Sequence, residues 1–496
     1  MSAIALFSAC SKRTVLEINP QHVVSENFIG NGVQWSAYPH ADTENAEWGK
    51  LMTDEKWDMN FQRLNYMQPK LFRIIDQANW RYLVGFDEQG NPILDFNTPE
   101  VKAVERMLDY AQANNITVLL GEWGVPFKVH DTAAGHSDKF DKANDPKWIS
   151  GIVEYLNYLI VDRGYTCIKH YNLVNEPNGD WATTNGNFAE WKSGAQALAQ
   201  ALRDRGLDKY ISIAGPDAVT RYDNPNSEYT GMGWVEEAVK QIDSDLGIYE
   251  VHDYTEYDLV RSGGFKDYHG AVAEFVKPTG KQIIFGELGF ARGGAENQAA
   301  VAADPFACED SQMDVYKFSY GIDMADALIQ SMNAGYSGAA AWALDDAMHT
   351  CGDLGNKNEL KRWGMWNSLG TELCNNPADE NMRPWFYAWS LLCRYFPTGS
   401  TVIGTAETEI EGLRLTAATY NDDVTIAIVN NSTQPHDLLL EYPFTKKLQQ
   451  FNYTDGERTL DENNFPLPIK TNIKADKKYD LSIPANSFVL ITSLDF

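Results

Sequence analysis

The chain has 496 residues, of which 44% are hydrophobic and 12% are aromatic, enough apolar side chains to bury a large core. This composition excludes a largely disordered chain. The 41 basic and 69 acidic side chains give a formal net charge of −28, spread along the chain, which disfavours nucleic acid and anionic membrane surfaces as partners.

The first residues resemble the end of a bacterial lipoprotein signal. A short apolar stretch with small residues, 4–9, precedes Cys10. It is too short to span a bilayer and has no basic start, so we expect residues 1–13 to be the remnant of a longer signal with a linker. Cys10 would then carry the lipid. This interpretation predicts a lipid-anchored protein of the bacterial cell envelope, at the outer-membrane surface or in the periplasm, or a secreted protein.

Short apolar or β-branched runs alternate with helix-like segments between residues 28 and 395, as is typical of repeated βα units. Apolar residues at helical spacing mark, for example, residues 99–114 and 188–205. The candidate strands are 29–35, 71–75, 117–123, 168–172, 210–214, 248–252, 282–285 and 338–342. These eight units predict an α/β fold, a (β/α)₈ TIM barrel over residues 28–395. An open doubly wound sheet is the alternative, but the glycine-rich phosphate turn of nucleotide-binding sheets is missing after the first strand.

The pattern changes after residue 395 to short alternating strands, and helical periodicity disappears. Clear examples are residues 413–417, 424–429 and 488–492. Residues 396–496 therefore predict a smaller antiparallel β-sandwich domain packed on the barrel. An early strand pattern in residues 14–27 precedes the barrel and could complete that sandwich.

Five cysteines remain apart from the candidate lipidation site, so at least one thiol is unpaired and a disulfide scaffold is excluded. Cys308, Cys351 and Cys374 lie in polar, loop-like surroundings and could supply one bridge, for which Cys351 and Cys374 are the favoured pair. Cys167 and Cys393 lie among apolar residues and predict buried thiols.

Two glutamates end predicted strands on the same rim of the barrel. The segment Asn172-Leu-Val-Asn175-Glu176-Pro177 follows the fourth strand, and Glu287 follows the seventh. The carboxyl ends of barrel strands share one rim, so these glutamates can converge. Retaining hydrolysis of a glycosidic bond needs one carboxylic acid and one carboxylate roughly 5–5.5 Å apart. The pair therefore predicts glycoside hydrolysis. The alternative is that each glutamate is an ordinary loop acid or helix cap.

Neighbouring residues offer the other parts of such a site. Asn175 is placed to hydrogen-bond a sugar hydroxyl, and Arg73 is placed to hold the nucleophile ionised. Alternation along the sixth strand puts His252 and Tyr254 on one face, where the phenol can hold the nucleophile's oxygen and the imidazole can shape the sugar pocket. Trp342 ends the eighth strand, where its indole face can stack under a sugar ring.

Three further tryptophans at predicted rim positions are candidates for sugar contacts, with packing against loops as the alternative. They are Trp35, Trp123 and Trp181. A groove with several tryptophans slightly favours internal cleavage of a polysaccharide. We expect a monomer that acts on a β-linked polysaccharide or oligosaccharide; the sugar and the linkage stay open.

This combination resembles the retaining glycoside hydrolases of clan A, in which a barrel carries an Asn-Glu acid/base pair at strand four and a glutamate nucleophile at strand seven. The resemblance covers most of residues 28–395 and implies that Glu176 is the acid/base and Glu287 the nucleophile, with no cofactor. The neighbours named above would bind the sugar or support the nucleophile. The accessory sandwich is more similar to families 30, 39 and 51 than to the bare barrels of family 5, and the family stays open.

Two other classes compete with a retaining glycosidase. One is a cell-surface carbohydrate-binding protein without catalysis, which would keep the aromatic groove but not the acids. The other is a metal-dependent barrel hydrolase, with ligands from one polar loop: His130, Asp131, His136 and Asp138. Their spacing matches no compact zinc motif, so a solvated or substrate-contacting loop is favoured.

Overall fold

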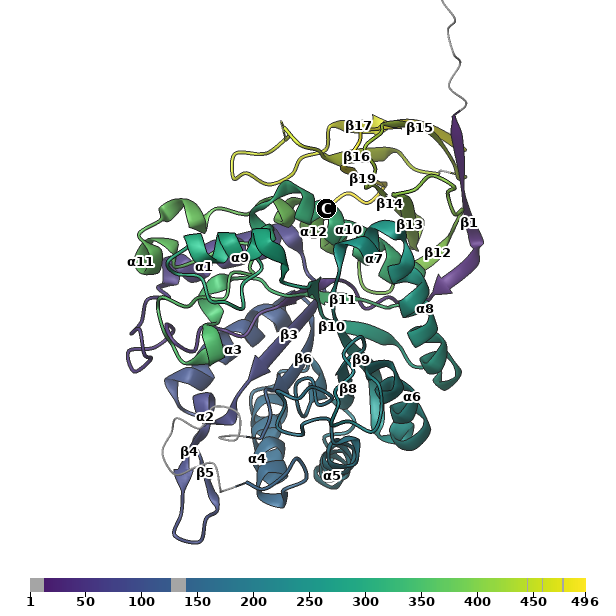
Figure 1. Cartoon of the computed structure of the whole chain (residues 1–496). Coiled ribbons are helices and arrows are strands. Elements are labelled where there is room, and N and C mark those ends of the chain that lie inside the picture. Colours follow the sequence, from purple (N-terminus) through teal and green to yellow (C-terminus); the bar gives the residue numbers. More distant parts are fainter. Residues whose placement is uncertain (1–12, 126–139, 444, 457, 475–476) are drawn as a thin grey trace, which may run out of the picture.

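The computed structural model describes residues 13–125, 140–443, 445–456, 458–474 and 477–496. The candidate lipidation site Cys10 and the four candidate metal ligands of the polar loop lie outside the described residues. Figure 1 shows two parts, a barrel and a C-terminal sheet that lies beside it. Within the described ranges, we find no helix with the length and apolarity that a bilayer crossing requires.

Eight parallel strands close into a barrel, which confirms the predicted fold class. Their order around the barrel is β2 (Gly32–Gln34), β3 (Leu71–Asp76), β6 (Thr117–Glu122), β7 (Ile168–Asn172), β8 (Ser212–Val219), β9 (Leu246–Thr255), β10 (Ile283–Phe290) and β11 (Ala339–Ala341). β11 pairs with β2 and closes the ring. Each of the eight runs predicted from sequence overlaps one of these strands.

Helices connect the strands and surround the barrel (Figure 1). The long ones are α1 (Asp54–Met67), α3 (Pro99–Ala113), α4 (Pro146–Asn157), α5 (Phe188–Arg205), α6 (Gly231–Ile242), α8 (Gly264–Val276), α10 (Phe318–Asn333) and α12 (Pro384–Arg394). The short ones are α2 (Ala78–Arg81), α7 (Tyr257–Ser262), α9 (Gly294–Ala303) and α11 (Gly370–Cys374). A hairpin of β4 (Leu83–Phe86) and β5 (Pro92–Leu94) projects between α2 and α3 in the chain.

Local signals set the ends of these helices. At α3, the Thr98 side chain accepts a hydrogen bond from the Val101 N–H, and Pro99 occupies the first turn, where its missing N–H costs nothing. At α5, the Asn187 side chain caps the start, and Gly206 ends the helix in the left-handed conformation (φ 73°) that glycine adopts without strain. Both helices were predicted from apolar spacing.

The floor of the barrel is a small apolar layer, and polar residues stand above it. The layer consists of Ile29, Leu71, Leu119, Ala214, Ile248, Ile284 and Ala340. Successive side chains of a strand alternate between inside and outside, so the second residue after a floor residue also points inward, one step nearer the rim. Arg73 stands in this way above Leu71, and Glu250 above Ile248. The polar interior therefore continues the same alternation.

The C-terminal sheet is mostly antiparallel, as predicted. Its order is β17 (Lys470–Ile473), β16 (Leu448–Tyr453), β19 (Ser487–Thr492), β14 (Asp423–Asn430), β13 (Leu413–Tyr420), β12 (Thr401–Thr405), β1 (Thr14–Ser25), β15 (His436–Glu441) and β18 (Lys478–Ile483). The N-terminal strand β1 is antiparallel to β12 and parallel to β15. Arg414 of β13 pairs with Asp326 of α10 at 2.7 Å, one contact that joins the sheet to the barrel.

The disulfide differs from the predicted pair. Cys308 is bonded to Cys351, and Cys374 is free. The reason is main-chain pairing, because the Cys308 N–H donates to the Leu360 carbonyl at 2.8 Å and the Cys351 N–H donates to the Glu359 carbonyl at 2.8 Å. This pairing brings the two cysteines together. Cys167 and Cys393 are buried free thiols, as predicted.

Candidate active site

Glu176 lies just beyond β7, at the rim of the barrel. Its backbone is left-handed (φ 48°), a conformation that is costly for residues other than glycine, and its N–H donates to Asp217 Oδ2 at 3.2 Å. The carboxylate is held by two ring nitrogens: Trp181 Nε1 donates to Oε2 at 2.6 Å, and His252 Nδ1 lies 2.9 Å from Oε1. The left-handed backbone and these contacts thus hold the Glu176 carboxylate in one position.

Glu287 lies on β10, where the strand pairing slips between Phe285 and Glu287 and turns the carboxylate into the barrel. Arg73 Nη1 and the Tyr254 hydroxyl donate to its two oxygens. A β-carbon on Gly286 would lie 1.4 Å from Glu250 Oε1, so only glycine fits at the slip. These two charge-assisted hydrogen bonds hold both oxygens of the Glu287 carboxylate in place.

The two carboxylates face each other across a short gap. One oxygen of Glu176, one oxygen of Glu287 and a ring nitrogen of His252 all lie within 4.8 Å of one another. Retaining glycosidases hold their carboxyl groups roughly 5–5.5 Å apart, whereas inverting ones need roughly 6.5–9.5 Å to admit a water. Two carboxylate oxygens this close together are compatible with the retaining geometry.

A buried polar layer supports this pair from below. Asp217 of β8 accepts from Arg73 Nη2 at 3.1 Å and lies 2.7 Å from His252 Nε2. Burial alone would raise the pKa of Asp217, but the charges of His252 and Arg73 hold it well below its ordinary range. Burial would lower the pKa of His252, yet Asp217 and Glu287 raise it well above its ordinary value. The negative charge of Asp217 in this layer is therefore balanced by the positive charges of Arg73 and His252.

Glu250 completes this layer and behaves differently from Asp217. Its Oε1 lies 3.1 Å from His252 Nε2 and 3.8 Å from Arg73 Nε. Burial, followed by the nearby negative charge of Asp217, raises the pKa of Glu250 to about 8. At neutral pH this carboxyl is therefore largely protonated, and it adds no full charge beneath the glutamates.

Arg73, predicted to hold the nucleophile ionised, and His252, predicted to shape the sugar pocket, are both buried residues. The side chains of Arg73 and His252 are 1% and 0% exposed, and both lie beneath the glutamates rather than in the cavity above them. They therefore position the carboxylates and do not touch a sugar. Asn175 and Tyr254, by contrast, line the cavity, and Asn175 Oδ1 accepts from Arg73 Nη2 at 2.7 Å.

A cavity of about 730 Å³ opens above Glu176 and Glu287, and three of the four predicted tryptophans line it: Trp123, Trp181 and Trp342. The Trp342 ring stacks on His349 at 5.4 Å, with the edge of Trp123 at 6.2 Å. Trp342 therefore presents a braced aromatic surface to the cavity.

The prediction for Trp35 is wrong. This side chain is 0% exposed and does not line the cavity. It follows β2 directly, and its ring packs in the core against Trp57 of α1 at 5.6 Å and Phe72 of β3 at 5.5 Å. The strand end was placed correctly, but the side chain points toward the helix layer.

Several residues of the site were not predicted from the sequence. Asp217 lies near the end of the fifth barrel strand, β8, and directly after the predicted run 210–214, so the strand-end rule that found the glutamates would have found it too. The others lie on loops without a recognisable pattern: Arg221, Arg292, Asp310, Lys361 and Trp363. Only the folded arrangement brings them to the cavity.

The hydrogen bonds of Glu287 compete with the binding of a metal ion in this site. The atoms of Glu176, His252 and Glu287 lie close enough together to share a metal ion. Yet both Glu287 oxygens already accept from Arg73 and Tyr254, and the guanidinium supplies the positive charge that an ion would bring. The described residues of the site therefore favour acid–base chemistry of the side chains themselves.

Glu122, at the end of β6, should make the free energy of unfolding depend on pH. It accepts from the Ala78 N–H at 3.1 Å and from the Tyr82 hydroxyl at 3.0 Å, and burial, followed by Asp76, raises its pKa to about 8. The folded state thus binds a proton that the unfolded state has released. Its contribution is complete below the unfolded pKa and is lost as pH rises toward 8, at about 1.4 kcal/mol per pH unit.

Urea unfolding of wild type and Glu122→Gln at pH 5, 6, 7 and 8 measures this contribution. The free-energy difference between the two proteins should change across the series in the direction that favours the variant at high pH. Glu154→Gln, at a surface ion pair on α4, is the matched control and should leave the pH dependence unchanged. Parallel curves for wild type and Glu122→Gln would refute the assignment.

The barrel with two opposed glutamates at its rim defines a glycosidase whose substrate is a carbohydrate. Residues 30–344 match the family model Cellulase (glycosyl hydrolase family 5), and the chain belongs to this family. The predicted resemblance to clan A is confirmed. A comparison with curated proteins gave no match.

Solved structures with the same fold align over nearly the whole chain, including the C-terminal sheet. A conserved exported protein from Bacteroides fragilis is 14% identical, with a TM-score of 0.68. A GH30 endoxylanase from Clostridium papyrosolvens C71 is 12% identical, with a TM-score of 0.62. A GH39 β-xylosidase from Caulobacter crescentus is 14% identical, with a TM-score of 0.61. Each alignment covers 97% of this chain and 100% of the other. At these identities the likeness establishes the fold.

Proposed function

We propose that this protein is a retaining glycosidase that cleaves β-linked polysaccharides or oligosaccharides by double displacement. The observation that carries the proposal is the facing pair, with oxygens of Glu176 and Glu287 within 4.8 Å of each other at one rim. Glu287 attacks the anomeric carbon, and Glu176 protonates the departing oxygen. The covalent glycosyl-enzyme is then hydrolysed by a water that Glu176 deprotonates.

The surroundings of each carboxylate support this division of roles. Glu287 accepts from a guanidinium and a phenol, which hold its oxygens in position for attack on the anomeric carbon. Glu176 faces His252 Nδ1 at 2.9 Å, while His252 Nε2 faces Asp217 at 2.7 Å. Because Asp217 and Glu287 raise the pKa of His252 well above its ordinary value, the imidazolium directs its Nε2–H at Asp217 and its Nδ1–H at Glu176. It can therefore pass the Nδ1 proton to Glu176 for the acid step and take it back after the base step.

The cavity supports a substrate larger than one sugar. Its volume of about 730 Å³ and its aromatic lining suit several pyranose or furanose rings, with Trp342 as the stacking surface. The related structures include an endoxylanase, an endo-β1,6-glucanase and a β-xylosidase, so both internal and terminal cleavage occur on this fold. We favour internal cleavage because the cavity is open and rich in tryptophan.

A screen tests the proposal. Wild type, Glu176→Gln and Glu287→Gln are incubated with β-linked xylans, glucans and mannans and with aryl β-glycosides, and released sugar is measured by chromatography. Release by wild type alone, with a ladder of oligosaccharides, supports internal cleavage by this pair. Binding without release in all three proteins would instead identify a carbohydrate-binding protein.

We also propose that the mature protein is a lipid-anchored or secreted protein of the cell envelope. The apolar stretch before Cys10 motivates this proposal, and the Cys308–Cys351 disulfide suits an oxidising compartment. Fractionation of cells that express the full-length gene tests it. Wild type should partition with membranes and Cys10→Ser with the soluble fraction, and equal partitioning of the two would count against lipidation.

A further inference from the structure

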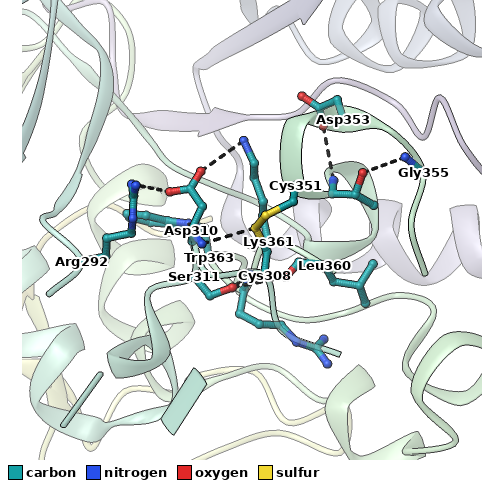
Figure 2. Close-up of a disulfide and its surroundings, with 12 residues drawn as sticks. Arg292, Cys308, Asp310, Ser311, Cys351, Asp353, Gly355, Leu360, Lys361 and Trp363 are labelled. Carbon is teal, nitrogen blue, oxygen red and sulfur yellow. Dashed lines mark hydrogen bonds and ion pairs between the residues drawn. A yellow bond between two sulfur atoms is a disulfide. The ribbon is translucent and has the colours of Figure 1, made fainter. Parts of the chain in front are cut away.

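One wall of the cavity is held together by the disulfide (Figure 2). Cys308 belongs to the segment between α9 and α10, and Cys351 to the segment that follows β11. Between them runs a third stretch, 359–361, whose carbonyls at residues 359 and 360 accept the N–H groups of the two cysteines. The bond therefore joins two loops around the stretch that carries Lys361.

Charged side chains of this wall face the cavity. Asp310 follows Cys308 by two residues, and its N–H donates to Cys308 Sγ at 3.3 Å. Its carboxylate pairs with Arg292, and Lys361 Nζ lies 3.3 Å from Oδ2. The Asp310 and Lys361 side chains are 29% and 15% exposed and line the cavity, so each keeps polar atoms within reach of a ligand.

The wall leads directly to the proposed nucleophile. The Trp363 indole N–H donates to the Asp310 carbonyl, and the Trp363 ring meets the Tyr254 ring edge-on at 5.3 Å. The Tyr254 hydroxyl in turn donates to Glu287. Asp310 and Lys361 therefore lie on an extension of the site where bond cleavage would occur.

We propose that Asp310 and Lys361 form a sugar-binding subsite beside the catalytic pair and that the Cys308–Cys351 disulfide holds this subsite in place. The inference rests on the proposed function. A carboxylate that accepts from one hydroxyl and an ammonium that donates to the next oxygen fit two neighbouring hydroxyls of a pyranose. Neither the strand pattern nor the catalytic motif in the sequence predicts a role for Asp310 and Lys361.

The charges of the cavity select a neutral sugar. Arg292 and Lys361 share Asp310, and Arg221 lies 3.4 Å from Asp253 and also pairs with Glu256. Within the described part of the chain, each cation that lines the cavity therefore already faces a carboxylate. Among the described residues, six carboxylates and three cations line the cavity, so a uronic acid would add a negative charge where negative charges are already in excess.

Isothermal titration calorimetry tests the subsite without depending on turnover. The probes are cellohexaose, xylohexaose, a β-1,3-glucohexaose, a β-1,6-gluco-oligosaccharide and a glucuronate-bearing xylo-oligosaccharide. Asp310→Asn and Lys361→Met should each raise the Kd of the neutral oligosaccharide that wild type binds by about 10-fold, the effect of losing one hydrogen bond to a charged group. The exposed neighbours supply matched controls, Glu309→Gln and Lys357→Met, which should bind as wild type does.

The disulfide is tested with the same oligosaccharide. Cys308→Ser/Cys351→Ser should raise Kd several-fold, and so should mild reduction of wild type, with near-UV circular dichroism to show that the fold persists. Cys374→Ser, at a thiol that forms no disulfide, is the control. If the oligosaccharide is also hydrolysed, KM should rise more than kcat falls in all the subsite variants.

The outcomes separate the subsite from the proposed function. Weaker binding in both Asp310 and Lys361 variants supports the subsite, even if wild type hydrolyses nothing and the glycosidase proposal fails. Hydrolysis by wild type with unchanged Kd in both variants overturns the subsite alone. Failure of wild type to bind any neutral probe, or tighter binding of the acidic one, overturns the subsite as stated. Unchanged binding in the disulfide variant removes the positioning role of the bond.

Discussion

Replacement of Glu287 with alanine is expected to lower kcat by roughly 10⁵-fold or more, the scale of loss when an enzyme's nucleophile is removed. The protein should stay folded, because alanine removes one buried carboxylate at the rim and leaves the apolar floor of the barrel intact. Initial rates on the substrate identified by the screen measure the loss, and circular dichroism checks the fold. Glu296→Gln, an exposed glutamate on α9, is the matched control and should retain wild-type activity.

Azide distinguishes the loss of a nucleophile from general damage. A small anion can occupy the space that the Glu287 carboxylate leaves and attack the anomeric carbon from the same face. An aryl β-glycoside should then yield an α-glycosyl azide, with inverted configuration, and part of the rate should return. Absence of rescue in a folded variant, with an active control, would count against Glu287 as the nucleophile.

Replacement of Glu176 with alanine is the second large effect. We expect kcat/KM to fall by about 10²- to 10⁴-fold on natural glycosides, because their leaving oxygen needs a proton. On an aryl glycoside with an acidic phenol, the first step needs little proton donation, so the loss should be much smaller. The ratio of the two losses, from steady-state kinetics, is the measurement. Asp180→Asn, an exposed acid four residues away, should reduce neither rate.

For Glu176→Ala we also expect a changed pH profile and a different azide product. Wild type should show a bell-shaped profile on the acidic side of neutral, because Glu287 must be ionised while Glu176 is protonated. Glu176→Ala should lose the basic limb of that bell. Azide should give a β-glycosyl azide, with retained configuration, because it replaces the water of the second step. A profile that keeps both limbs would contradict the assigned acid.

The barrel and its two glutamates were predictable because their signals are local. Each strand is a short apolar run, and an acid that ends such a run must stand at the common rim. The same rule would have found Asp217. The inward direction of Glu287 was not predictable, because it depends on a slip in pairing beside Gly286 rather than on simple alternation.

Features that depend on packing between distant loops were not predictable. The disulfide partner of Cys351 is Cys308 because residues 359–360 form main-chain hydrogen bonds with both cysteines. The spacing of the cysteines in the sequence does not predict these hydrogen bonds. For Trp35, the predicted position at a strand end was right, but the predicted direction of the side chain, toward the cavity, was wrong. His252 was placed on the correct face, but its depth beneath the glutamates is set by neighbouring strands.

Trapping of the covalent intermediate shows directly whether Glu287 is the nucleophile of a retaining reaction. Wild type is incubated with a 2-deoxy-2-fluoro-β-glycoside of the sugar identified by the screen, with dinitrophenolate as the leaving group, and is then digested and examined by mass spectrometry. We expect one fluorosugar per protein, on the peptide that contains Glu287, and none in Glu287→Gln. A label on a different residue, or natural-substrate turnover with inversion and no adduct, would contradict it.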